Sequence, residues 1–388
     1  MASSSLSVFF EGPYSESGTH EAAAKIREGL PGPATIVFAF VTPDYLPVLD
    51  DFIDTIRVDG HVAEVVGCTA SNLIAGGTET QNEPGFSLVA LHSPGTTTRV
   101  LDLSTDRIAS SVGPDSWREA AADMTGWVVL GNPYGFAADD WLDEWNVVAP
   151  GVPTVGGVAS GGDNESEIAV FHNSELQSAA VAVGFAGALE LLPAVSQGCR
   201  PIGEALPVTR AEDNIVFALG SRPAYQALES AFESLSETER SHAQGNLFAG
   251  LANNEYVEEF RSGDFLIRSI IGADPNSGAV VIGGVPRLGQ TLQYQLRDSA
   301  AADADLRDVL AEFPRRHETP VASLVFSCLG RASKFFSDAN HDAALVQKHL
   351  QSHHSAGFFG NGEIGPVGGR NCVHAYTASC AVFYDRHV

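Results

Sequence analysis

The sequence is poor in basic side chains. It has 22 Lys and Arg against 48 Asp and Glu, only Lys25, Lys334 and Lys348 are lysines, and the formal net charge at pH 7 is −26. Nucleic-acid binding needs Lys and Arg clustered against phosphates, and anionic membrane surfaces attract the same residues. We therefore expect neither nucleic acid nor a membrane among the partners of this protein.

Cysteine and long apolar runs are also scarce. No apolar run reaches the ~20 residues that cross a bilayer, and Met1–Pro13 lacks the basic and apolar regions of a secretory signal. The cysteines are odd in number, widely spaced and without a C-x-x-C pair, which indicates reduced thiols rather than disulfides or a zinc site. We expect a cytoplasmic protein. The five cysteines are Cys68, Cys199, Cys328, Cys372 and Cys380.

What the sequence does contain is a series of short apolar runs with helical stretches between them. With 388 residues, 44% hydrophobic and 18% charged, it has a globular composition and a length typical of two domains. Continuous apolar runs are typical of strands buried on both faces. Expected strands lie at 34–41, 62–67, 86–91, 127–130, 168–171, 179–185, 214–219, 265–271, 279–283, 291–297, 321–328 and 374–384, and expected helices at 19–30, 117–122, 223–235, 300–313 and 340–354.

This pattern predicts an α/β fold of two packed α/β domains with mixed sheets. Residues 1–33 form an N-terminal extension with the first helix, 34–205 the first domain and 212–388 the second, with a boundary at 205–212. Both halves run from apolar strands through a helix to a glycine-rich string, which leaves open a distant two-fold internal duplication. In the last strand, 374–384, alternation predicts one wetter face.

Three strings place a polar or charged side chain among glycine and apolar residues. They are Gln197-Gly198-Cys199-Arg200-Pro201-Ile202-Gly203, Phe326-Ser327-Cys328-Leu329-Gly330-Arg331, and the glycine-rich run from Gly357 to Asn371. Such strings occur where the backbone closely approaches a ligand or another segment and one side chain is held in place. We expect the functional site to lie at these strings.

At these residues the chain resembles the FIST family of sensory domains. The FIST N-terminal module is similar at 67–69, 156–160 and 196–203, and the FIST C-terminal module at 264–268, 271–275, 327–331 and 356–371. The resemblance implies binding of small ligands, with amino acids among the candidates, and transfer of the signal to other modules; some members are similar to haem gas sensors. No kinase, chemotaxis or F-box segment is present, so the expected output is a separate signalling protein. Ala332 stands where members commonly carry Gly.

Cys328 and Arg331 follow a buried strand, where α/β sheets bind ligands. Arg331 could bind a ligand carboxylate with Cys328 lining the pocket, or Arg331 could pair with a carboxylate of its own domain while Cys328 packs in the core. As a nucleophile Cys328 would need a base, for which His341 and His374 are the candidates.

The string Gly360–Gly365 satisfies G-x-G-x-x-G, but Pro366 follows where a dinucleotide site needs a helix. We interpret it as a tight glycine-rich turn that projects Asn361 and Glu363. Glu363 would receive a ligand ammonium or pair with Arg370. Arg331 or Arg370 together with Glu363 would then hold an amino acid.

At the junction of the halves, Arg200 beside Cys199 could bind ligand or clamp the two domains together, and the clamp is favoured. His349 and His353 have metal or haem-ligand spacing on one expected helix, yet a solvated helix end is favoured there.

Together these observations predict a ligand-binding sensor with no catalytic residues and no cofactor. The alternatives are a cysteine- or acid/base-dependent enzyme on a small metabolite, a haem-based gas sensor and an interaction scaffold. The ligand, the partner and the oligomeric state are left open. The candidate ligand-binding residues are Cys328, Arg331, Asn361, Glu363, Arg370, Asn371, Cys199 and Arg200.

Overall fold

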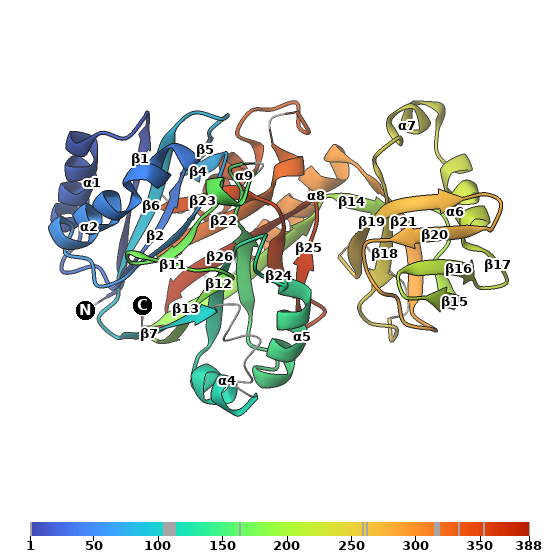
Figure 1. Ribbon diagram of the computed structural model, residues 1–388, viewed down its shortest axis with the longest axis horizontal. Coiled ribbons are helices and arrows are strands. Elements are labelled where there is room, and N and C mark those ends of the chain that lie inside the picture. The colour runs from blue at the N-terminus through green and yellow to red at the C-terminus, as the bar shows by residue number, and fades with distance from the viewer. Residues whose placement is uncertain are drawn as a thin grey trace. The chain divides into compact units, whose positions relative to one another are not determined.

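The computed structural model describes residues 2–103, 114–162, 164–257, 260, 263–313, 319–332, 334–351 and 354–387. The chain forms two compact units of mixed α/β structure (Figure 1). Unit 1 comprises Met1–Val195, Leu306–Val373 and Thr377–Val388, and unit 2 comprises Ser196–Asp305 and His374–Tyr376. Among the described helices, none combines the length and apolar character that a membrane span requires.

Unit 1 is built from three sheets that share one strand order. Their orders are β1-β6-β2-β3-β10-β11, β7-β12-β8-β9-β24-β25 and β13-β26-β22-β23-β4-β5. In each sheet two central parallel strands, β2 and β3, β8 and β9, or β22 and β23, are flanked by antiparallel strands. The three sheets are therefore three copies of one arrangement.

The order along the chain repeats in the same way, with a helix before each pair of parallel strands and another between them. The first repeat is β1 (Ser4–Glu11), α1 (Glu16–Gly29), β2 (Ile36–Val41), α2 (Leu49–Asp59), β3 (Val65–Thr69), β4 (Leu73–Ala75), β5 (Thr78–Glu79) and β6 (Gly85–His92). The second is β7 (Thr96–Leu103), α4 (Pro114–Ala121), β8 (Gly126–Gly131), α5 (Ala138–Val148), β9 (Thr154–Val158), β10 (Val170–His172), β11 (Glu175–Leu176) and β12 (Ala180–Gly187). The third is β13 (Leu189–Gln197), α8 (Ser299–Ala311), β22 (Ala322–Cys328), α9 (His341–Leu350), β23 (Ser355–Gly360), β24 (Glu363–Val367), β25 (Arg370–His374) and β26 (Thr377–Asp385).

Each repeat lends its fourth and fifth strands to the sheet of another repeat. Hairpin β4–β5 joins the sheet of the third repeat through β23, β10–β11 joins that of the first through β3, and β24–β25 joins that of the second through β9. The exchange is cyclic, so no repeat completes its own sheet. The duplication left open by the sequence is thus three-fold and internal to unit 1, rather than two-fold between the halves.

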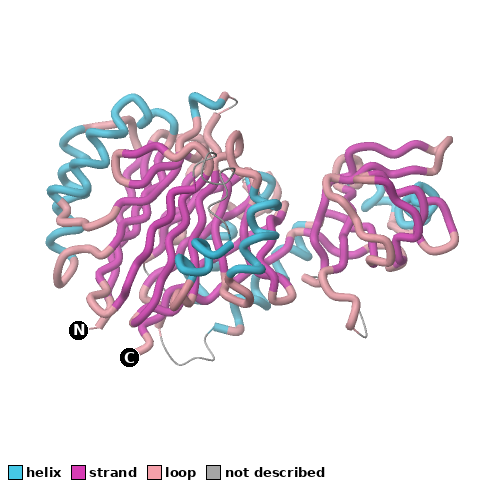
Figure 2. The backbone as a smooth tube through the Cα atoms, turned by 60° about the horizontal axis from the view of Figure 1, so that its bottom comes forward, coloured by secondary structure: helices cyan, strands magenta, loops and turns pink. Residues whose placement is uncertain are grey.

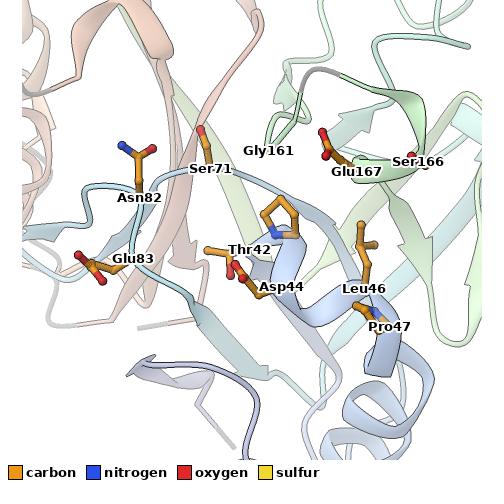
Figure 3. A pocket seen from close by; sticks show the side chains of 11 residues that line it. Thr42, Asp44, Leu46, Pro47, Ser71, Asn82, Glu83, Gly161, Ser166 and Glu167 are labelled. Atoms are coloured by element: carbon orange, nitrogen blue, oxygen red, sulfur yellow. The ribbon is translucent and has the colours of Figure 1, made fainter.

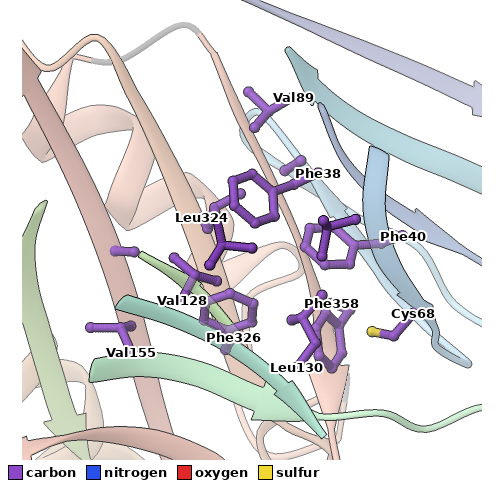
Figure 4. Packing of buried hydrophobic residues seen from close by; sticks show 14 of the residues in the cluster. Phe38, Phe40, Cys68, Val89, Val128, Leu130, Val155, Leu324, Phe326 and Phe358 are labelled. Carbon is purple, nitrogen blue, oxygen red and sulfur yellow. The ribbon is translucent and has the colours of Figure 1, made fainter. Parts of the chain in front are cut away.

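The inner faces of the three sheets pack on one another, and helices cover the outer faces. Phe40 of β2 contacts Phe326 of β22 and Phe358 of β23, with ring centroids 6.2 and 5.0 Å apart (Figure 4). In β2, Phe38 and Phe40 belong to this central core, whereas Val37 and Ala39 pack under α1 and α2. This burial on both faces explains why the strands are continuous apolar runs. It also corrects the expectation for β26, all of whose residues are buried.

Helices α4 and α5 cover the second sheet, where Trp127, Trp141 and Trp145 are buried, and α8 and α9 cover the third. The two ends of the chain meet at the point where the third repeat would continue into the first. The backbone N–H of Ser3 donates to Asp385 Oδ2 over 2.5 Å. Figure 2 shows the N- and C-terminal ends near the same edge of the strands.

Unit 2 is an antiparallel barrel inserted into the third repeat between β13 and α8. Strands β15, β16, β20, β19, β18 and β21 pair in that order, and β21 pairs again with β15 to close the ring. Its elements are β14 (Cys199–Pro201), β15 (Leu206–Glu212), β16 (Ile215–Leu219), β17 (Arg222–Pro223), α6 (Ala224–Glu233), α7 (Glu237–His242), β18 (Leu247–Ala252), β19 (Phe265–Asp274), β20 (Ala279–Ile282) and β21 (Thr291–Arg297).

The compact units divide the chain elsewhere than the expected boundary at 205–212. The chain enters unit 2 at Ser196 and leaves it at Asp305. The two differ because the segment interpreted as a connection between domains forms strands of unit 2. Both β14 and β15 pair with β21.

Candidate functional site

The candidate site lies at the carboxyl end of the parallel strands β22 and β23 in unit 1. Cys328 ends β22 and pairs with Gly360, which ends β23. A single 3-10 turn, Leu329–Arg331, follows β22 and places Arg331 beside the first turn of α9. Glu363 begins β24 next to Thr377, the first residue of β26. Carboxyl ends of neighbouring parallel strands are where α/β sheets hold ligands.

Arg331 is fully buried and paired with Asp342 of α9. Its Nε and Nη2 atoms donate to Asp342 Oδ2 and Oδ1, each over 2.8 Å. Asp342 also accepts from Ser327 Oγ over 2.5 Å and lies 2.9 Å from Nδ1 of His341. Phe336 covers the guanidinium, 5.1 Å from the ring centroid to Cζ, and stacks on His341. The structure therefore shows Arg331 paired with a carboxylate of its own unit.

The buried pair is ionised. Burial on its own raises the pKa of Asp342, but the Arg331 charge and the hydrogen bonds from His341, Arg331 and Ser327 outweigh it and hold the pKa well below the ordinary value. For Arg331, burial lowers the pKa, and the charge of Asp342 more than compensates and raises it. A buried charge needs a partner of this kind, since an isolated one costs several kcal/mol.

Glu363 is completely buried and forms no ion pair within the part of the chain that the structure describes. Its Oε2 accepts the backbone N–H of Thr377 over 3.2 Å, and its carboxyl group accepts a hydrogen bond from the Cys328 thiol. Burial raises the pKa of Glu363 well above the ordinary value, against the opposing effects of the Thr377 N–H, Arg331 and Cys328. Desolvation therefore favours the neutral carboxylic acid here.

Two polar atoms of this site lack a hydrogen-bond partner among the described residues. They are Nη1 of Arg331 and Oε1 of Glu363, both buried from solvent. The two side chains also interact electrostatically with each other and with Cys328. Buried polar atoms are nearly always paired, so two unsatisfied ones beside a single thiol call for an explanation.

The other candidates in the glycine-rich run stabilise the fold. Asn361 is exposed and donates to the carbonyl of Ala159. Asn371 is buried, accepts the N–H of Thr154 and donates to the carbonyl of Val152. Arg370 is exposed and pairs with Asp143 over 2.6 Å, so the expected pair with Glu363 is not formed. The expected turn is the two-residue connection Asn361-Gly362 between β23 and β24, and Glu363 is buried as the first residue of β24.

Cys199 and Arg200 belong to unit 2, whereas Cys328, Arg331 and Glu363 belong to unit 1. Cys199 is buried against Phe248 and Phe265. Arg200 forms ion pairs with Glu239 and with Asp298, the latter over 3.3 Å. Both partners lie in the expected second domain, 212–388, and Arg200, Glu239 and Asp298 all belong to unit 2 of the structure.

The sequence interpretation missed Asp342, Ser327 and Thr377. Asp342 looked like an acidic residue of a helix first turn, which usually complements the helix dipole in solvent. Its only sequence signal is its place two residues before the apolar Ala344-Leu345-Val346 run. His341, one of the two histidines considered as a base, contacts Asp342. The acidic side chain that interacts with Cys328 is Glu363.

No group of three or more His, Cys, Asp or Glu side chains within the described part of the chain is arranged to hold a metal ion. Of the two metal-spaced histidines, His349 lies on α9 and His353 lies outside the described residues. Burial lowers the pKa of His349, helped by the nearby charges of Lys348 and Arg307.

A separate cleft of about 440 Å³ lies at the carboxyl ends of β2 and β3 (Figure 3). Asp44, Glu83 and Glu167 line it, and none of its described lining residues is basic. Its charge disfavours a carboxylate ligand and suits a cation. The remaining lining residues are Thr42, Pro43, Leu46, Pro47, Ser71, Asn82, Gly161 and Ser166.

Solved structures show only weak overall similarity to this chain. A crystal structure of cyanuric acid hydrolase from A. caulinodans covers 99% of both chains with 8% identity and a TM-score of 0.32. A second cyanuric acid hydrolase covers 98% of this chain and 100% of its own, with 12% identity and a TM-score of 0.30. Similarity at this level carries no argument about fold or function.

Sequence relatives are much closer. "Uncharacterized protein Rv0628c" of Mycobacterium tuberculosis is 36% identical over 372 residues, 94% of this chain and 95% of that protein. "Uncharacterized protein Mb0898c" of Mycobacterium bovis is 37% identical over 325 residues, 83% of each chain. The FIST N domain matches residues 35–222 and the FIST C domain residues 224–366. Nearly the whole chain is thus matched, and the protein belongs to the FIST family, whose domains are associated with sensory signal transduction.

Proposed function

We propose that the protein binds a small carboxylate at the Cys328–Arg331–Glu363 site and acts in the cytoplasm as the ligand-binding component of a sensory pathway. The observation that carries the proposal is the pair of unsatisfied buried atoms, Arg331 Nη1 and Glu363 Oε1. A ligand oxygen would satisfy the guanidinium N–H, and a second polar group of the ligand would meet the carboxyl group. The bound state is proposed to be read by a separate signalling protein.

The charges of the site favour a carboxylate over an ammonium group. Arg331 retains a free N–H on a guanidinium that is already held in place by Asp342, and a fixed guanidinium is a preorganised carboxylate donor. Glu363 is a weak partner for an ammonium ion, because burial raises its pKa and so favours its neutral form. We therefore propose simple carboxylates and 2-oxo acids, rather than amino acids, as the ligands of this site.

A thermal-shift screen tests this proposal. Purified protein is heated with acetate, lactate, pyruvate, glyoxylate and single amino acids, and an absorption spectrum is recorded with and without added haem. A ligand of the native state raises the melting temperature by mass action, about 2.7 kcal/mol at 100 times Kd. The proposal expects stabilisation by carboxylates that Glu363→Gln weakens and Glu83→Gln, in the acidic cleft, leaves unchanged.

Other outcomes would contradict it. Stabilisation lost in Glu83→Gln but kept in Glu363→Gln would move the ligand to the cleft of Figure 3. A Soret band with no response to carboxylates would favour haem sensing. No response to any compound would leave the two unsatisfied atoms without a ligand and remove the support for a sensor at this site.

A further inference from the structure

The Cys328 thiol differs from the other four in its surroundings. Cys68, Cys199, Cys372 and Cys380 are buried, and Cys328 is partly exposed. Two polar side chains interact with the thiol. Arg331 has an unsatisfied N–H group, and Glu363 has an unsatisfied carboxyl oxygen. Exposure together with polar neighbours distinguishes a thiol that can react from one that only fills space.

The carboxyl group of Glu363 is held in an orientation that separates its two oxygens. Oε2 accepts the N–H of Thr377. The Cys328 thiol interacts with this carboxyl group, and Oε1 has no hydrogen-bond partner among the described residues. A neutral carboxylic acid in this orientation accepts a proton at Oε2 and carries one to give at Oε1. One side chain can therefore act as base and acid in a single event.

We propose that Cys328 adds reversibly to the carbonyl carbon of small 2-oxo or aldehyde acids, with Glu363 as the proton relay and Arg331 as the carboxylate donor. This inference rests on the proposed function, since it names the class of carboxylate that the site takes. In this inference the ligand is bound covalently to Cys328 and is released by the reverse reaction.

The step balances without any oxidant or co-reactant. The sulfur electron pair forms a bond to the carbonyl carbon, and the S–H proton passes to Oε2 of Glu363. The carbonyl π pair moves onto its oxygen, which takes the proton from Oε1. The product is a hemithioacetal or hemithioketal with one new hydroxyl group. Glu363 ends as it began, a neutral acid with its proton on the other oxygen.

Arg331 orients the ligand in this scheme. Asp342 fixes two of its nitrogens, and the third, Nη1, remains for the ligand carboxylate. A carboxylate next to the carbonyl carbon would be bound while that carbon faces the thiol. An uncharged aldehyde lacks this interaction and should bind far more weakly, and a carboxylate without a carbonyl should bind without reacting.

The test uses pyruvate labelled with ¹³C at the carbonyl carbon. We expect the carbonyl resonance to be replaced by that of a tetrahedral carbon when full-length protein is added, and to return on dialysis. The same adduct should slow alkylation of Cys328 by iodoacetamide, read by mass spectrometry with buried Cys68 as the internal control. Cys328→Ser should abolish the tetrahedral signal. At saturating ligand, Glu363→Gln should leave the final amount of adduct nearly unchanged but slow its formation about 100-fold, the usual worth of acid–base catalysis.

The outcomes separate this inference from the function on which it rests. If pyruvate raises the melting temperature, yet its carbon remains a carbonyl and the stabilisation survives in Cys328→Ser, covalent capture is overturned and carboxylate binding stands. If neither acetate nor pyruvate stabilises the protein, both are overturned. An adduct that forms equally fast in Glu363→Gln would remove Glu363 from the reaction.

Discussion

Arg331 and Asp342 face each other through two parallel hydrogen bonds of 2.8 Å, and both side chains are at most 1% exposed. The pair joins the turn after β22 to the first turn of α9. It thereby fixes the one cation of the candidate site in a single orientation. The geometry is that of a guanidinium fork on a carboxylate, which is the strongest form of the ion pair.

Replacing Asp342 with Asn should destabilise the protein by about 3–5 kcal/mol, because it leaves the buried Arg331 charge without its partner. Urea unfolding followed by circular dichroism measures the change. The matched control is Asp143→Asn, which breaks the exposed pair with Arg370 and should cost less than about 1 kcal/mol. Equal losses in the two variants would show that the buried pair has no special role.

The stability of the protein should fall with rising pH because of Glu363, whose pKa burial raises well above its ordinary value. The native state keeps this proton while the unfolded state loses it near pH 4.5. Stability from this group is therefore complete below pH 4.5 and decreases by about 1.4 kcal/mol per pH unit until the folded pKa is reached. Glu363→Gln removes this dependence, so the difference in melting temperature between the variant and the wild type should shift in favour of the variant as the pH rises above 4.5. Parallel curves would contradict the prediction.

His172 should make a pH-dependent contribution of the same sign at a higher pH. Its Nδ1 and Nε2 atoms lie 3.1 Å from Asp102 and 2.9 Å from Glu64. The hydrogen bond with Asp102, followed by that with Glu64, outweighs burial and raises the pKa to about 9. The stabilisation is complete below about pH 6.5 and is lost as the pH rises through 9. Chemical denaturation of the wild type and His172→Gln from pH 6 to 10 should therefore converge at the alkaline end.

A circular permutant should test the three-fold repeat. Because Ser3 contacts Asp385, a short Gly/Ser linker between the two ends would supply the missing link between the third and first repeats. Opening the chain between His92 and Thr96, where the first repeat passes into the second, preserves every strand. We expect this permutant to unfold cooperatively with a melting temperature within a few degrees of the wild type. One opened at Phe38, inside the buried β2, should not fold, and equal behaviour of the two would argue against the repeat.

Much of the local structure was readable from sequence, and the wider connections were not. The run at 34–41 predicted a strand buried on both faces, and β2 is one because Phe38 and Phe40 face the central core while Val37 and Ala39 face helices. The segment 374–384 was predicted with a wetter face, which was wrong because both faces of β26 are covered. Phe383 belongs to the central core, and Val382 packs in the cluster under α8 and α9. The exchange of hairpins between sheets leaves no local signal in the sequence, because a hairpin has the same sequence pattern whichever sheet it joins.

The candidate site was predicted in part. The strings at 326–331 and 357–371 contain Cys328, Arg331 and Glu363, which interact in the structure. Mixed α/β structure in two domains was confirmed. Arg370 was assigned to Glu363 by its charge, whereas the pleat of β25 leaves it in solvent beside Asp143. Sequence could not show that Asp342 lies under Arg331, because that contact depends on the packing of α9 on the sheet.

The cyclic exchange of hairpins also governs how the chain can be made. Leu73 of β4 pairs with Phe358 of β23, near the opposite end of the sequence. At translation rates of about 5–20 residues per second, that hairpin emerges tens of seconds before its partner strand exists. Ile74 and Leu73, both fully buried in the finished protein, would spend that interval without a sheet. We therefore expect the nascent chain to be prone to aggregation for most of its synthesis and to need protection during translation.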